Sequence, residues 1–151
     1  MIKEYEIYHG SVLSRVLHAV SEDVILKALT AYGNLAYLVN QTTVLYIKYS
    51  SKRLSPWSFS FSCAHHDDIL SLNKQFGRLV LALVCGKDGI VTIDFEELQH
   101  LLGSPTEKGA SINCQRRRLE MYTVKGTAGE LTTKIGDNHL IEKLFASSGL
   151  K

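Results

Sequence analysis

The pattern of apolar residues predicts a single-domain α/β fold built on a mixed sheet. Stretches with helical spacing alternate with short runs rich in β-branched and aromatic residues, and turn-forming residues separate them. A chain of 151 residues is long enough for one hydrophobic core. Its 45% apolar and 21% charged residues are typical of folded domains. The expected core is helix-strand-strand-strand-helix-strand over residues 9–102, followed by a β-hairpin and a short helix within residues 111–151.

The first part of the chain predicts two short amphipathic helices. Residues 11–20 place apolar side chains at helical spacing. Ser21 is expected to cap the second helix, because Glu22 and Asp23 follow it in the acidic first turn that helices favour. Gly33 is a suitable residue to end that helix.

Three strands are expected next. Residues 35–39 and 44–49 are mostly apolar, and residues 40–42 between them are typical of a turn. Lys48 interrupts the second of these strands. Residues 57–62 alternate strictly between aromatic residues and serine, so the aromatic side chains, Trp57 included, are expected in the core.

A helix is then expected over residues 66–76, with Asp67 and Asp68 in its first turn and Gly77 at its end. Residues 79–85 are apolar throughout, which predicts a central strand covered on both faces. The remaining predicted elements are a tight turn at 86–89, a strand at 90–93, a helix with a capping box from Asp94 to Glu97, hairpin strands at 117–125 and 130–135, and a final helix at 140–145.

Charge, cysteine content and hydropathy limit the class of protein. A formal net charge of +2 excludes a histone-like basic protein but permits a local basic strip. Cys63, Cys85 and Cys114 lie far apart, which argues against a disulfide framework and favours the reducing cytoplasm. The charged start lacks the apolar core of a signal peptide, and no apolar run is long enough to span a bilayer, so no membrane partner is expected.

The order of the elements and the segment 40–48 resemble the PD-(D/E)XK, or restriction-endonuclease-like, superfamily. The resemblance implies a metal-binding Asp at the position of Asn40, a Glu or Gln at Tyr46 and a lysine at Lys48, and only the lysine is retained. The acidic residue of the first helix would fall near Ser14. The resemblance therefore implies a nuclease-like fold with an eroded metal site, with Lys48 and Asn40 as candidate catalytic residues and Mg²⁺ as cofactor only if activity is retained.

Basic residues cluster in two places and suit a phosphate backbone. On the predicted strand, Arg116 and Arg118 would share one face and Arg117 the other. A lysine on an edge strand that discourages sheet pairing is the alternative interpretation of Lys48. The candidate nucleic-acid-binding residues are Lys48, Lys52, Arg53, Arg116, Arg117 and Arg118.

Two functions follow from these residues. The first is a nucleic-acid-binding or nuclease-related protein that contacts DNA or RNA. The second is a non-enzymatic interaction protein, such as a phage, defence or regulatory accessory factor, that binds an acidic protein partner. The sequence is also compatible with a homodimer. The run His65-His66-Asp67-Asp68 is not expected to bind a metal, because consecutive residues in a helix diverge.

Overall fold

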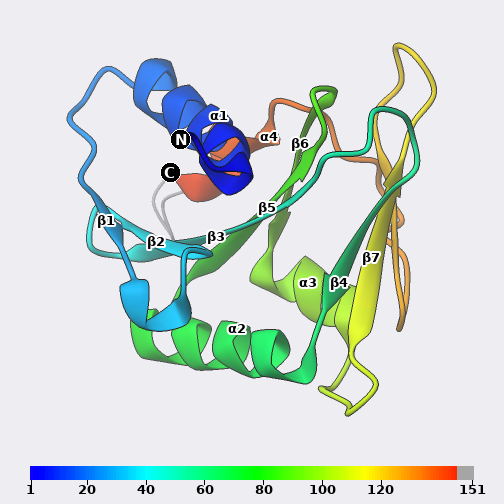
Figure 1. Ribbon diagram of the computed structural model, residues 1–151. Coiled ribbons are helices and arrows are strands. Elements are labelled where there is room, and N and C mark those ends of the chain that lie inside the picture. The colour runs from blue at the N-terminus through cyan, green and yellow to red at the C-terminus, as the bar shows by residue number, and fades with distance from the viewer. Residues whose placement is uncertain (146–151) are drawn as a thin grey trace.

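The computed structural model describes residues 1–145 and contains two β-sheets with helices around them (Figure 1). The strands are β1 (Leu26–Ala28), β2 (Ala36–Val39), β3 (Thr43–Ser50), β4 (Trp57–Phe61), β5 (Leu79–Cys85), β6 (Gly89–Asp94), β7 (Ala110–Gln115) and β8 (Thr123–Gly126). The helices are α1 (Glu4–Ala19), α2 (Cys63–Phe76), α3 (Phe95–Leu102) and α4 (His139–Leu144), with one 3-10 turn, η1 (Thr30–Tyr32).

The larger sheet has five strands in the order β1-β2-β3-β5-β6, and the smaller has three in the order β4-β7-β8. Neighbouring strands are antiparallel except β3 and β5, which pair in parallel. A parallel pair needs a crossover connection. Here the chain leaves β3, passes through β4 and α2, and returns as β5. The predicted α/β class with a mixed sheet is confirmed.

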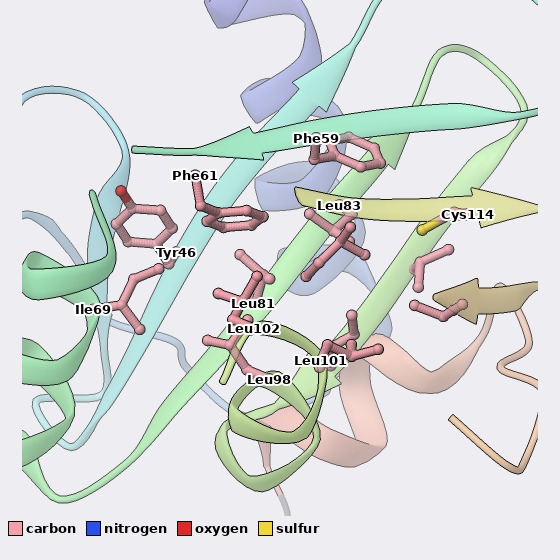
Figure 2. Packing of buried hydrophobic residues seen from close by; sticks show 14 of the residues in the cluster. Tyr46, Phe59, Phe61, Ile69, Leu81, Leu83, Leu98, Leu101, Leu102 and Cys114 are labelled. Carbon is pink, nitrogen blue, oxygen red and sulfur yellow. The ribbon is translucent and has the colours of Figure 1, made fainter. Parts of the chain in front are cut away.

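The two faces of the larger sheet bury separate groups of side chains. On one face, residues such as Tyr46, Leu81 and Leu83 pack with α2, α3 and the smaller sheet, which contributes Phe59 and Phe61 (Figure 2). The opposite face packs against helices α1 and α4, with apolar residues from both helices in the second cluster. Each buried leucine or phenylalanine contributes roughly 1.5–3 kcal/mol to folding, so these two layers supply the main stabilising term.

Strand β5 is the central strand that the sequence predicts. All seven of its residues are buried, and they alternate between the two clusters. The alternation predicted for residues 57–62 is also confirmed, because Trp57, Phe59 and Phe61 are buried while Ser58 and Ser60 are exposed.

The helix ends follow the expected chemistry, with one correction. Asp94 accepts a hydrogen bond from the Glu97 N–H at 2.9 Å, and Glu97 accepts one from the Asp94 N–H at 3.0 Å, which is the predicted capping box. Gly77 ends α2 with a φ of 83°. Helix α2 begins three residues earlier than predicted, because Ser62 caps it, so Asp67 and Asp68 lie beyond its first turn.

The second predicted helix is wrong, and the first is longer than expected. Helix α1 runs over 16 residues without a break. The segment after it forms β1 instead, because its backbone pairs with β2 in the register Leu26↔Val39 and the Leu29 N–H donates to the Ala36 carbonyl at 2.9 Å. Pairing with a neighbouring strand overrides the helical spacing of its side chains.

The predicted strand at residues 117–125 is also wrong in its first half. Strand β8 begins at Thr123, and the three arginines lie in the connection between β7 and β8. The returning half of the hairpin is reduced to two bridges, Tyr122↔Ile135 and Lys125↔Glu130. Because β7 pairs with β4, the C-terminal part of the chain shares the core of the first part.

Within residues 1–145, no helix is both long enough and apolar enough to cross a lipid bilayer.

Candidate functional site

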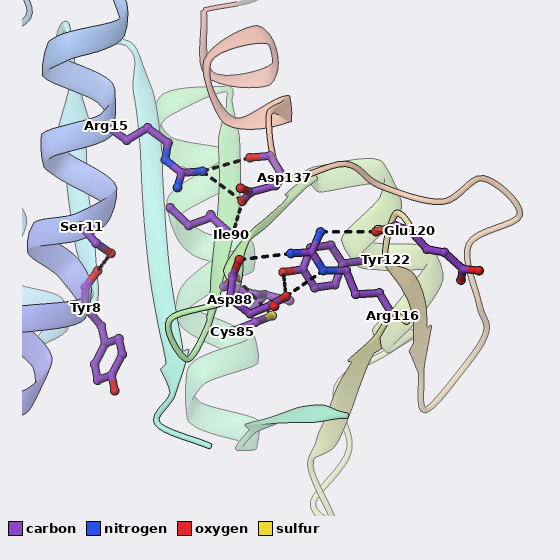
Figure 3. A network of polar contacts seen from close by, with 11 residues as sticks. Tyr8, Ser11, Arg15, Cys85, Asp88, Ile90, Arg116, Glu120, Tyr122 and Asp137 are labelled. Carbon is purple, nitrogen blue, oxygen red and sulfur yellow. Dashed lines mark hydrogen bonds and ion pairs between the residues drawn. The ribbon is translucent and has the colours of Figure 1, made fainter. Parts of the chain in front are cut away.

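The connection between β7 and β8 is fixed by a partly exposed polar network (Figure 3). The Arg116 guanidinium donates from Nε to Asp88 Oδ2 at 2.8 Å, from Nη2 to the Asp88 carbonyl at 3.2 Å and from Nη1 to the Glu120 carbonyl at 3.3 Å. It also stacks on the Tyr122 ring, 4.4 Å from the ring centre. The Tyr122 hydroxyl donates to the same Asp88 oxygen at 2.5 Å. Arg116 is therefore committed to holding this connection in place.

Burial of the Tyr122 hydroxyl, together with its hydrogen bond to Asp88, raises the pKa of Tyr122 well above its ordinary value. The hydroxyl therefore stays protonated at neutral pH and donates its hydrogen bond to Asp88.

A second loop, residues 51–56 after β3, is tied to the same place. The Arg116 N–H donates to Ser55 Oγ at 3.2 Å, and the Trp57 indole N–H donates to the Lys52 carbonyl at 2.8 Å. The β5–β6 turn packs close below this loop, since a Cβ on Gly86 would lie 2.3 Å from the Lys52 carbonyl oxygen. The two basic segments of the sequence therefore meet at one end of the smaller sheet.

Two adjoining surface hollows lie where these loops meet. The first, of about 400 Å³, is called the arginine hollow below, and it is lined by Arg53, Leu54, Ser55, Trp57, Asp88, Arg116, Arg117, Arg118 and Leu119. The second, of about 490 Å³, shares three of these residues and is lined by Ser55, Gln115, Arg116, Arg117, Glu120, Thr123 and Lys134.

The two hollows concentrate positive charge. Five cations and two carboxylates line them, an excess of three positive charges, whereas the whole chain carries a net charge of +2. The carboxylates are already paired, Asp88 with Arg116 at 2.8 Å and Glu120 with Lys134 at 3.6 Å. In the part of the chain that the structure describes, Arg53, Arg117 and Arg118 are exposed and their side chains make no hydrogen bond or ion pair. These three guanidinium groups are available for an anionic ligand.

The prediction that the three arginines lie on a strand is wrong. A strand would have put Arg116 and Arg118 on one face. In the structure Arg116 is partly buried and ion-paired, while Arg117 and Arg118 extend from a turn toward solvent. Arg53 lines the same hollow as these two arginines, whereas Lys48 and Lys52 do not line it.

Lys48 lies elsewhere, between the two sheets. Its side chain leaves β3 on the face that carries Tyr46, and its amine donates to the Ser60 carbonyl of β4. The amine also lies 3.3 Å from His65 Nδ1 and 4.6 Å from the centre of the Phe61 ring. Burial lowers the pKa of Lys48 from 10.5 to about 8. No residue that lines the arginine hollow is among these contacts.

Burial and the nearby Lys48 charge both lower the pKa of His65. The imidazole is therefore mainly neutral at neutral pH and can accept a hydrogen bond from the Lys48 amine at Nδ1.

Two further candidate residues, Asn40 and Lys52, each make a hydrogen bond to a nearby backbone group. Asn40 occupies the β2–β3 turn with a φ of 50°, and its side-chain oxygen accepts a hydrogen bond from the Ile25 N–H at 2.8 Å. The five residue steps from Thr43, the first residue of β3, to Lys48 span roughly 16 Å, so Asn40 and Lys48 do not form one site. The Lys52 amine donates to the Pro56 carbonyl at 2.8 Å, within its own loop.

Among residues 1–145, no group of three or more His, Cys, Asp or Glu side chains lies close enough together to hold a metal ion. On α2, His66 is buried while Asp67 is exposed, so these neighbouring side chains point in different directions.

The sequence interpretation missed the apolar part of the arginine hollow. Leu54 and Leu119 line it beside the free arginines, and they are 63% and 96% exposed. A signal for them exists, because two similar triplets occur in the chain: Lys52-Arg53-Leu54 and Arg117-Arg118-Leu119. The first triplet brings one arginine and one leucine to this hollow, and the second brings two arginines and one leucine.

No family model, no curated protein and no solved structure matches this chain.

Proposed function

We propose that this chain is a nucleic-acid-binding protein whose arginine hollow contacts the phosphate backbone. The observation that carries the proposal is the presence of three unpaired guanidinium groups, those of Arg53, Arg117 and Arg118, around one hollow. A guanidinium group matches the geometry of phosphate with paired N–H donors. The local charge excess also attracts a polyanion over a longer range.

The second part of the proposal is kinship with PD-(D/E)XK nucleases whose metal site has eroded. It is supported by the lysine at Lys48 on β3, whereas the order of the elements up to β5 contains β1, one strand more than the sequence predicts. The contacts of the Lys48 amine are a carbonyl, an imidazole and an aromatic ring rather than a carboxylate. We therefore expect no cleavage of DNA or RNA with Mg²⁺ or Mn²⁺. Cleavage that Lys48→Ala abolishes would contradict the eroded site.

We place the protein in the cytoplasm as part of the same proposal. Its three cysteines are free thiols, two of them buried, which suits a reducing compartment.

Fluorescence anisotropy with labelled single- and double-stranded DNA and RNA tests the binding function. Affinity is measured between about 50 and 200 mM salt, where phosphate contacts release counterions. The variant Arg53→Gln/Arg117→Gln/Arg118→Gln removes three such contacts. On duplex DNA we expect it to lower the slope of log affinity against log salt by about 3, since each contact contributes roughly 0.9.

The control variant removes the same charge from exposed lysines outside both hollows: Lys27→Gln, Lys74→Gln and Lys108→Gln. It is expected to keep most of the affinity and the slope. Equal losses in both triple variants would show a nonspecific charge effect and contradict the site. If neither DNA nor RNA binds at low salt, the proposed function is wrong and an acidic protein partner takes its place.

A further inference from the structure

The tip of the β7–β8 connection holds an apolar side chain out into solvent. The Glu120 N–H donates to the Arg117 carbonyl at 3.1 Å and closes a four-residue turn. Leu119 is the third residue of that turn and has a φ of +68°. Glycine or asparagine usually occupies a turn position with positive φ, because a side chain is strained there. A leucine at this position is therefore costly to the fold.

Packing within the chain does not explain this leucine. The side chain of Leu119 is 96% exposed, so it gains no burial in return for the strained backbone. The turn is nonetheless held firmly, since Arg116 donates to the Glu120 carbonyl and to Asp88. A strained residue on a rigid, exposed support is a common feature of binding sites.

Leu54 repeats the arrangement from the other loop. It follows Arg53, is 63% exposed, and lines the arginine hollow together with Leu119. The two loops are joined through the Arg116 N–H and Ser55 Oγ, so both leucines belong to one supported surface.

The surroundings of the leucines favour a nucleic acid over a protein partner. Protein interfaces have a contiguous apolar centre with charged residues at the rim. Here the two leucines line the same hollow as the free cations Arg53, Arg117 and Arg118. That mixture fits architectural DNA-binding proteins, which place cations on the backbone and insert an apolar wedge between base pairs.

We propose that Leu119, supported by Leu54, enters the base stack of a DNA duplex and unstacks one step while the free arginines hold the flanking phosphates. This inference rests on the proposed nucleic-acid-binding function and specifies its ligand as duplex DNA that can be locally distorted. A duplex with a mismatch has less stacking to lose, so it should bind more tightly than a fully paired duplex.

The test uses two short duplexes with 2-aminopurine, a base whose fluorescence rises on unstacking, next to a central TA step or next to a mismatch. The wild-type protein is expected to raise the fluorescence of the paired duplex and to bind the mismatched one about tenfold more tightly or better. Leu54→Ala/Leu119→Ala is expected to lose both effects while keeping the salt dependence that the arginines provide.

Leu17→Ala/Ile25→Ala is the matched control, since both side chains are exposed and lie outside the hollow. It is expected to behave as wild type. Because all four substituted side chains are exposed, unchanged thermal unfolding confirms that the variants fold.

The outcomes separate the wedge from the binding function. Salt-dependent binding with no fluorescence rise and no mismatch preference overturns the wedge and leaves the proposed function standing. Failure to bind either duplex, combined with Leu119-dependent binding of a synthetic peptide of alternating glutamate and leucine, overturns the wedge and points to a protein partner. A fluorescence rise that persists in Leu54→Ala/Leu119→Ala also overturns the wedge.

Discussion

Replacing Lys48 by methionine should change how the stability of the fold depends on pH. The Lys48 amine is partly buried between the two sheets, and burial lowers its pKa from 10.5 to about 8. This difference corresponds to about 3 kcal/mol for keeping the amine charged in the folded state. Because part of the side chain is exposed and the amine keeps its hydrogen bond to Ser60, we expect about 1–2 kcal/mol after solvent screening.

The sign follows from proton linkage. Below pH 8 the amine is protonated in the folded and the unfolded chain, and the folded state carries the full cost of the buried charge. Between pH 8 and 10.5 the folded state releases the proton first, so the wild-type protein gains stability as pH rises. Lys48→Met has no proton to release, and its stability should not show this gain.

The assay is urea unfolding of both proteins from about pH 7 to pH 10, with the difference in unfolding free energy plotted against pH. The difference should move in favour of the wild-type protein by about 1–2 kcal/mol across this range. Lys74→Met, on the exposed face of α2, is the control and should follow the wild-type curve. A wild-type-minus-Lys48→Met difference that stays flat would refute the buried-amine reasoning.

Two further predictions concern the core. Burial lowers the pKa of His9 from 6.5 to about 4, so the wild-type protein should lose stability as pH falls from 6.5 to 4, because only the unfolded chain takes up a proton there. His9→Phe removes the hydrogen bond to Tyr37 and the titrating group. Between neutral pH and pH 4 its stability should therefore fall by about 1–3 kcal/mol less than that of the wild-type protein, as measured by thermal unfolding. An equal fall in both proteins would contradict this reasoning. Gly126→Ala should cost about 1–3 kcal/mol, because its Cβ would lie 2.2 Å from the Leu101 carbonyl oxygen. Gly10→Ala, in α1 with no atom within 4 Å of the new Cβ, should instead be neutral or stabilising by up to about 1 kcal/mol, and an equal cost at both sites in denaturant unfolding would rule out the clash.

Elements with strong local signals could be predicted from the sequence. Strand β5 is apolar throughout, strand β4 alternates, and Asp94 with Glu97 caps α3, so residue type and spacing alone define them. The second predicted helix failed because its spacing suits a helix, whereas its backbone pairs with β2 through contacts such as Leu26↔Val39. Such pairing depends on residues distant in sequence and leaves no local signal.

The candidate site was predicted in part for the same reason. Arg53 and the arginine run, which are candidates by their charge, line one hollow. Lys48 does not join them, because β4 enters the smaller sheet and covers the amine. The ion pair between Arg116 and Asp88 was not predicted, since it depends on how the β5–β6 turn lies against the end of β7. Nor does the sequence reveal that Leu119 has positive φ.

The uneven charge of the molecule bears on how fast it meets a ligand. The two hollows hold three more positive than negative charges, while the remaining residues together sum to one net negative charge, because the chain as a whole is +2. The concentrated positive charge attracts an approaching polyanion toward the arginine corner. Added salt should therefore slow the encounter itself and leave the lifetime of a complex, once formed, less affected.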